Sequence, residues 1–234
     1  EKSYSMPIIC LDNNKTGEKE NEKTEEGEHQ SFISFKGIRH PIIEHINQKV
    51  EYIDNDLSLG KDTLDGILLF GVNASGKSSL MKAIGINLIM AQAGFFVAAK
   101  ELKYYPFDYL FTRIWNNDNI FNGQSTFEVE ISELKSIIKH AGKKSLVLGD
   151  ELCSGTETVS ASAIVTAGIK KLSASQAKFI FATHLHFLAD NQHLVKLENV
   201  KNYHLSVIFD KAKDKLIYDR KLKEGSGPST YGLE

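Results

Sequence analysis

The sequence has little cysteine, almost no net charge and no long apolar run, and each of these absences excludes a class of protein. Its two cysteines, Cys10 and Cys153, match neither a zinc-ligand spacing nor a disulfide framework, which favours a reducing compartment. No apolar run reaches the about 18 residues of a membrane-spanning helix, and the first residues lack the pattern of a secretory signal. We therefore expect an intracellular protein with no membrane partner, whether of the cytoplasm, the nucleus, an organelle or a viral factory.

The charge balance argues against a basic DNA-binding domain. Lys and Arg number 28 against 30 for Asp and Glu, which gives a formal net charge of -2 and no overall attraction for a polyanion. Apolar residues make up 41% of the 234 residues, enough for the core of one large domain. Because the sequence begins with Glu1 and not with methionine, we expect a piece of a longer chain.

Residues 1–30 and 31–234 differ in composition. Residues 12–30 contain no large apolar side chain, so the first part is predicted to be disordered or inserted. From residue 31 onward, apolar runs alternate with segments of helical periodicity. This pattern predicts strands in 31–35, 51–53, 66–70, 145–152 and 177–188, helices over 77–90, 125–142 and 158–174, and an antiparallel hairpin in 203–225. Such alternation implies an α/β fold with a mostly parallel sheet between helices and an antiparallel edge portion.

A glycine-bounded loop follows the apolar run 66–70 and opens the helix predicted from Lys77. Residues 71–78 read GVNASGKS and satisfy the phosphate-loop pattern G-x-x-x-x-G-K-[ST] in its expected strand-to-helix context. The glycines let successive N–H groups point inward at the positive end of a helix. Lys77 is then expected to reach the β- and γ-phosphates of a nucleotide, and Ser78 to bind Mg²⁺. The alternative, a chance glycine-rich turn with a surface lysine, fits this context poorly.

Two later strand ends carry polar side chains that phosphoryl transfer requires. Asp150 suits the Mg²⁺ shell, and Glu151 suits the task of polarising the attacking water. Alone, such a pair is commonly a helix cap or a solvated turn, but together with the phosphate-loop motif it favours a catalytic role. His184, after the next apolar run, is expected to sense the γ-phosphate as a neutral imidazole rather than to be an ordinary core or surface histidine. His186 stays unassigned.

A series of segments resembles, in order, the C-terminal ATPase domain of the MutS mismatch-repair family. The segments are RHPIIE, DNDLSLG, GVNASGKSSLMKAIGINLIMAQAGFFVAA, FTRI, GQSTFEVEI, DELCSGTE, FATHLHFL and STYGLE, within residues 35–234. The details NASGKSS and ELCSGTE look closest to the divergent branch known from giant viruses and octocoral mitochondria. The resemblance implies that residues 31–234 form a P-loop ATPase domain of the ABC type.

The resemblance also implies a Mg²⁺-dependent ATPase with the ATP held between two protomers. Asp150 would hold the metal together with Ser78, Glu151 would be the base, and His184 would be the switch histidine. The phosphates would be held by the residues that match the family's loop, namely Gly71, Asn73, Ala74, Ser75, Gly76, Lys77, Ser78 and Ser79.

Four further residues receive roles only through the resemblance. Gln92 would be the Q-loop residue, and Ser125 would be the signature serine offered to the γ-phosphate of the partner protomer. Tyr52 and His204 would flank the adenine, although an aromatic residue in a strand more often belongs to the core.

The sequence departs from the usual family pattern at the loop and at the dimer seam. The loop usually reads G-P-N-M-G-G-K-S-T, and the departures are Val72, Ala74, Ser75 and Ser79, none of which the phosphate chemistry requires. Cys153 and Ser154 stand within the usual G-R-G-T run and remove a basic group, and Trp115 replaces a glycine. The departures outside the loop bear on communication between protomers more than on nucleotide binding.

The leading hypothesis is an ATP-hydrolysing dimerisation domain of a MutS-like protein, which couples its nucleotide state to a clamp closing on DNA. Its partner would be a second MutS-type protomer, in a homodimer, and DNA would be bound by domains outside this chain. A nucleotide-switched interaction module with little turnover is the second hypothesis. The third, an ABC-type ATPase of chromosome maintenance or transport, is disfavoured because the STF segment at 125–127 departs from an L-S-G-G-Q signature.

Overall fold

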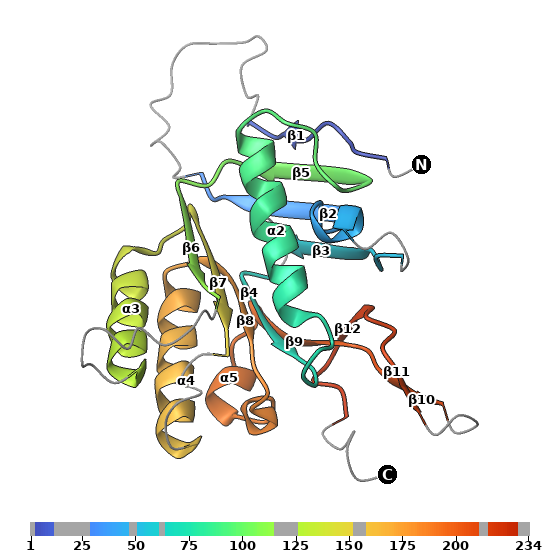
Figure 1. Cartoon of the computed structure of the whole chain (residues 1–234). Coiled ribbons are helices and arrows are strands. Elements are labelled where there is room, and N and C mark those ends of the chain that lie inside the picture. The colour runs from blue at the N-terminus through green and yellow to red at the C-terminus, as the bar shows by residue number, and fades with distance from the viewer. Residues whose placement is uncertain are drawn as a thin grey trace, which may run out of the picture.

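The computed structural model describes residues 3–11, 29–46, 51–60, 64–114, 126–151, 158–210 and 215–228, which form a mixed α/β structure (Figure 1). Its strands are β1 Ile8–Ile9, β2 Phe32–Ile38, β3 Asn55–Leu59, β4 Gly66–Phe70, β5 Glu101–Tyr105, β6 Tyr109–Arg113, β7 Ser145–Asp150, β8 Lys178–Ala182, β9 Val200–Leu205, β10 Ile208–Asp210, β11 Lys215–Ile217 and β12 Leu222–Glu224. Its helices are α1 Ile43–Ile46, α2 Lys77–Gln92, α3 Thr126–His140, α4 Thr158–Ala174 and α5 Gln192–Val195, and a 3-10 turn covers His186–Leu188.

The larger sheet has six strands in the order β12-β9-β4-β8-β7-β6. All neighbours are parallel except β12, which runs antiparallel to β9 at one edge. The predicted mostly parallel sheet is therefore confirmed. Because β4, β8 and β7 are adjacent and parallel, the loops that follow them leave the sheet at the same edge, where ligands of open α/β sheets commonly bind.

Both faces of this sheet are buried, which is why its central strands are continuous apolar runs. In β4, Ile67 and Leu69 pack into the core that includes α2, whereas Leu68 and Phe70 pack into the core of α3, α4 and α5. Figure 1 shows α2 on one side of the sheet and these three helices on the other. The predicted helices at 77–90, 125–142 and 158–174 are confirmed as α2, α3 and α4, although Ser125 lies outside the described residues. Among the described helices, none combines the length and the apolar character that a membrane crossing requires.

A second sheet, of order β1-β5-β2-β3, packs against the same core as α2. The strand predicted at 51–53 is wrong: the strand begins at Asn55, because the buried positions that alternate and pair with β2 are Asn55, Leu57 and Leu59. In the segment predicted to be disordered or inserted, Ile8–Ile9 instead pair in parallel with β5. Residues 12–28 lie outside the described part of the chain.

The predicted hairpin in 203–225 is confirmed as the antiparallel pair β10 and β11. These two strands form a sheet of their own, and the chain then returns as β12 to the edge of the six-stranded sheet. The return brings Arg220 close to the loop between β4 and α2. The Cδ of Arg220 lies 3.9 Å from the position that a Cβ would take if Gly76 carried a side chain.

Candidate functional site

The loop between β4 and α2 depends on two glycines. Gly71 has φ 148° and Gly76 has φ 107°, backbone conformations that residues with a side chain rarely adopt. A Cβ on Gly71 would also lie 2.8 Å from Ser75 Oγ, so another residue there would have to displace the Ser75 side chain. Ala74 has φ 63°, a left-handed conformation that is modestly strained for a residue other than glycine. Strained residues of this kind cluster at functional sites.

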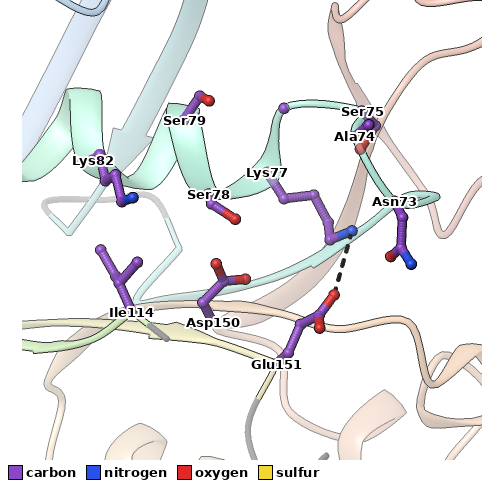
Figure 2. Close-up of a pocket in the computed structure, with 11 residues that line it drawn as sticks. Asn73, Ala74, Ser75, Lys77, Ser78, Ser79, Lys82, Ile114, Asp150 and Glu151 are labelled. Atoms are coloured by element: carbon purple, nitrogen blue, oxygen red, sulfur yellow. Dashed lines mark ion pairs between the residues drawn. The ribbon is translucent and has the colours of Figure 1, made fainter. Parts of the chain in front are cut away.

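Helix α2 begins at the mouth of a pocket without a side-chain cap and without an acidic residue in its first turn. Its first N–H groups and the positive end of its dipole are therefore directed at the pocket, which favours an anion there. The pocket has a volume of about 410 Å³, and its lining consists of Asn73, Ala74, Ser75, Gly76, Lys77, Ser78, Ser79, Lys82, Ile114, Asp150 and Glu151 (Figure 2).

Lys77 is the buried cation of this pocket, with 5% of its surface exposed. Its Nζ donates to Gly71 O at 2.7 Å and to Val72 O at 3.3 Å, and lies 4.0 Å from Glu151 Oε1. Burial lowers the pKa of Lys77, an effect that the nearby Glu151 and Asp150 carboxylates oppose. Since carbonyl groups compensate a buried ammonium group only in part, a bound anion would find a ready partner in this side chain.

Asp150 and Ser78 present oxygen atoms to each other from opposite walls of the pocket (Figure 2). Asp150 ends β7 and is 6% exposed, and its Oδ1 is buried with no hydrogen-bond partner among the described residues. A carboxylate and a hydroxyl are the ligand types that Mg²⁺ accepts, and Mg²⁺ typically takes the rest of its shell from water and phosphate oxygens. The described residues contain no group of three or more His, Cys, Asp or Glu able to hold a metal. The residues present therefore fit a magnesium ion that arrives with a nucleotide.

Glu151 adopts a left-handed backbone conformation with φ 47°, a strained geometry for a residue other than glycine. Its N–H donates to Ala182 O at 2.9 Å, which fixes the turn after β7 against the end of β8. Its Oε1 lies 4.0 Å from Lys77 Nζ and 4.0 Å from His184 Nδ1. The structure thus brings the loop lysine, the acidic pair and His184 together from the ends of three adjacent elements.

A second, smaller pocket of about 130 Å³ adjoins the other side of the loop. Tyr52 lines this pocket, as a residue that flanks the adenine would. Burial raises the pKa of Tyr52 to about 12. Arg220 also lines it, with φ 55° and with its carbonyl accepting from Asn55 Nδ2 at 3.1 Å. No motif marks Arg220 in the sequence. Arg220 lies at this pocket because the chain returns there just before β12 pairs with β9.

Gln92 and His204 are predicted site residues that line neither of these two pockets and make other contacts. Gln92 ends α2, about 22 Å along the helix from Lys77, and its amide bonds the backbone of Phe107, with Nε2 to O at 3.1 Å and Oε1 accepting from N at 2.8 Å. His204 lies on β9 with its Nδ1 2.9 Å from Gly225 O. Gln92 is thus engaged at the far end of α2 and His204 with the segment after β12.

His186, which the sequence left unassigned, lies close to the site. Its ring packs on Phe70 with 5.6 Å between the ring centroids. Burial lowers the pKa of His186, and His184 and Lys77 lower it further. The imidazole therefore tends to stay neutral beside the loop lysine.

Comparison with known proteins gives matches over most of the chain. Residues 67–234 match the family model described as MutS domain V. A mitochondrial DNA mismatch repair protein mutS homolog from Sarcophyton glaucum is 46% identical over 205 residues, which cover 88% of this chain and 20% of that protein. A putative DNA mismatch repair protein mutS homolog from Acanthamoeba polyphaga mimivirus is 38% identical over 237 residues, 87% of this chain and 21% of that protein. The DNA mismatch repair protein MutS of Clostridium novyi (strain NT) is 35% identical over 237 residues, 100% of this chain and 24% of that protein. The chain therefore spans a quarter or less of the length of these relatives.

Proposed function

The chain belongs to the MutS family, and from this premise we propose that it is the ATP-binding and ATP-hydrolysing domain of a DNA mismatch repair protein. Residues 31–234 would form an ABC-type P-loop ATPase domain, with residues 3–11 added to its second sheet. The observation that carries the proposal is the convergence of Lys77, Ser78, Asp150 and Glu151 on one pocket at the start of α2 (Figure 2).

In the binding step, the N–H groups of the loop and of the first turn of α2 donate hydrogen bonds to the phosphate oxygens. Lys77 replaces its two hydrogen bonds to loop carbonyls with hydrogen bonds to β- and γ-phosphate oxygens. The charged phosphate oxygens stabilise its buried ammonium group more than neutral carbonyls do. Ser78 and Asp150 would hold Mg²⁺, which would supply positive charge to neutralise the phosphate oxygens. Asp150 Oδ1, which has no hydrogen-bond partner within the part of the chain that the structure describes, supports this assignment because metal binding would satisfy it.

In the chemical step, Glu151 orients the attacking water and accepts its proton. Its strained backbone aims the carboxylate into the space beside Lys77 and His184. His184, which is half exposed, is positioned to contact the γ-phosphate once the nucleotide is bound.

The adenine would occupy the smaller pocket beside the loop. Tyr52 offers a ring face, and Arg220 offers a planar cation, both of which stack on a purine. We therefore assign Arg220 to the nucleotide site in place of His204, whose ring is engaged with Gly225.

The site would be completed by a second protomer. In this proposal, Ser125 of each chain reaches the γ-phosphate bound by the other chain, and the nucleotide state is coupled to a clamp closing on DNA. DNA would be bound by other parts of the parent protein, inside the cell.

Steady-state phosphate release at saturating Mg²⁺–ATP tests the proposal, with EDTA-treated samples as the control. We expect turnover that depends on Mg²⁺. Tight ATP binding without phosphate release above the EDTA background would instead indicate a nucleotide-switched interaction module.

A further inference from the structure

Asn55, the first residue of β3, joins that strand to the segment just before β12. Its Nδ2 donates to Arg220 O at 3.1 Å, and its Oδ1 accepts from Leu222 N at 2.7 Å. Asn55 is buried, with 6% of its surface exposed. One buried amide group therefore satisfies two backbone groups of this segment, one on either side of Lys221.

Arg220 needs such support because its backbone is strained. Its φ is 55°, a left-handed conformation that persists in a residue other than glycine only where the surroundings hold it. Besides the contact with Asn55, Arg220 N donates to Ser206 O at 2.9 Å, and Ser206 N donates to Lys221 O at 2.9 Å. The segment is thus bonded to β3 on one side and to the residue after β9 on the other.

This contact lies at the smaller pocket beside the phosphate loop. Asn55, Arg220 and Tyr52 all line that pocket. Burial raises the pKa of Tyr52, and the positive charge of Arg220 opposes the rise, so the guanidinium lies within electrostatic reach of the Tyr52 hydroxyl. The amide oxygen and nitrogen of Asn55 are already engaged by backbone groups. Asn55 can therefore act on a bound base through Arg220 rather than by direct contact.

We propose that Asn55 is a positioning residue, which holds Arg220 where its guanidinium stacks on the adenine of the bound nucleotide. The inference rests on the proposed function, because it requires the adenine to occupy the smaller pocket. Without the Asn55 amide, the Arg220 backbone is released from its left-handed conformation and the guanidinium loses its place beside the base. The phosphate contacts remain, because the loop and the start of α2 form them.

Asn55→Leu tests this role, because it keeps a side chain of similar size and removes both hydrogen bonds. Isothermal titration measures the binding of ATP and of inorganic tripolyphosphate, which carries the phosphates without a base. The affinity for ATP should fall about fivefold or more, as the loss of a cation stacked on a ring would cause. The affinity for tripolyphosphate should stay within about twofold, because the phosphate contacts are independent of Arg220. Parental ATP affinity, or an equal loss for both ligands, would overturn the proposal.

A double-variant cycle with Arg220→Met shows whether Asn55 acts through Arg220. Arg220→Met alone should weaken ATP binding by a similar factor. Adding Asn55→Leu to Arg220→Met should then change the ATP affinity by less than about twofold, because the guanidinium that Asn55 positions is already absent. Losses that multiply in the double variant would show that Asn55 supports the nucleotide in another way, and they would overturn the inference.

Arg220→Met also separates failure of this inference from failure of the proposed function. If Arg220→Met binds ATP as tightly as the parent, Arg220 does not hold the adenine, and the inference falls with that part of the proposed function. If Arg220→Met weakens ATP binding and Asn55→Leu does not, the adenine assignment stands and only the inference is overturned.

Lys221→Met is the matched control within the same segment. It removes an ion pair with Asp54, 2.7 Å between Nζ and Oδ1, and leaves the two hydrogen bonds of the Asn55 amide in place. Solvent-exposed ion pairs contribute little, so the ATP affinity of Lys221→Met should stay within about twofold of the parent. A loss equal to that of Asn55→Leu would show that any loosening of the segment suffices, which would overturn a specific role for Asn55. Should Asn55→Leu fail to fold, Asn55→Ala removes the same amide with less bulk and should show the same loss of ATP affinity.

Discussion

Lys77 is the residue on which nucleotide binding depends most directly. Its ammonium group is buried and is held by two loop carbonyls that a phosphate would replace. Lys77→Ala should weaken ATP binding by roughly ten- to a hundredfold, because a charge-assisted hydrogen bond is worth about 1.5 to 3 kcal/mol. Nucleotide titration measures the change, and Lys36→Ala, which removes an exposed lysine of β2, is the control. Unchanged ATP and ADP affinity in Lys77→Ala would remove the phosphate-loop assignment.

The acidic pair permits a separation of chemistry from metal binding. Glu151→Gln keeps the size of the side chain but loses the base, so Mg²⁺–ATP should still bind while turnover falls by roughly a hundredfold or more. Asp150→Asn should instead shift the Mg²⁺ concentration needed for binding, because it weakens a metal ligand. Single-turnover hydrolysis and Mg²⁺ titrations measure the two effects, with the exposed Glu198→Gln as control. Parental turnover in Glu151→Gln would identify Glu151 as a turn residue and not as the base.

His40 caps the start of helix α1, and we expect stability to depend on pH through its side chain. His40 Nδ1 accepts from the N–H groups of Ile42 and Ile43, each at 3.3 Å, which only an unprotonated Nδ1 can do. Burial lowers the pKa of His40, and Lys82 lowers it further. The unfolded chain therefore takes up this proton at about pH 6.5, before the folded chain does, so stability should fall as pH decreases from about 6.5 toward the lowered pKa.

Replacement of His40 tests this dependence. His40→Asn retains a side-chain acceptor for the helix start but does not titrate, so the free energy of unfolding should vary less between pH 7.5 and 5.5. Urea unfolding at several pH values measures it, and the exposed His193→Gln is the control. Burial also lowers the pKa of His186, so part of the pH dependence of the unfolding free energy should remain in His40→Asn. An unchanged pH dependence in His40→Asn would contradict the capping role.

The elements that the sequence predicted are those whose pattern does not depend on distant partners. The strands β4, β7 and β8 are buried along their whole length and have apolar central residues because both sheet faces are covered, and α2 follows a recognisable loop. The strands β5 and β6 mix polar and apolar residues and were not predicted, and of β9 only residues 203–205 lay within the predicted hairpin. Their strand conformation is stabilised by pairing with neighbours far away in sequence, which local propensity does not encode.

The same distinction applies to the site. The loop and the acidic pair were predictable because each follows a strand directly, and parallel strands carry their ends to one edge. Arg220 was not predictable, because its place depends on the antiparallel return of β12. Gln92 was given a role at the nucleotide by motif resemblance, yet the uninterrupted α2 carries it away from the loop.

At the scale of the whole molecule, the chain spans 20% to 24% of its relatives' length, and its charge is nearly balanced. We expect it to bind duplex DNA weakly at physiological salt, with little preference for a mismatch, because its 28 lysines and arginines are outnumbered by 30 acidic residues. Fluorescence anisotropy with matched and mismatched duplexes measures both. Submicromolar, mismatch-selective binding would place the DNA-reading surface within this chain.

The central claim is that two chains of this protein together form each ATPase site, and mixing two inactive variants tests it most directly. Ser125→Arg blocks what a chain offers to its partner, and Glu151→Gln disables the chain's own base. In a mixed dimer, one site carries both lesions and the other carries neither, so the account predicts that activity returns to about half of the parental value per heterodimer. If each site lay within one chain, every site would keep its own lesion. Isolated heterodimers that remain as inactive as the separate variants would therefore contradict the account.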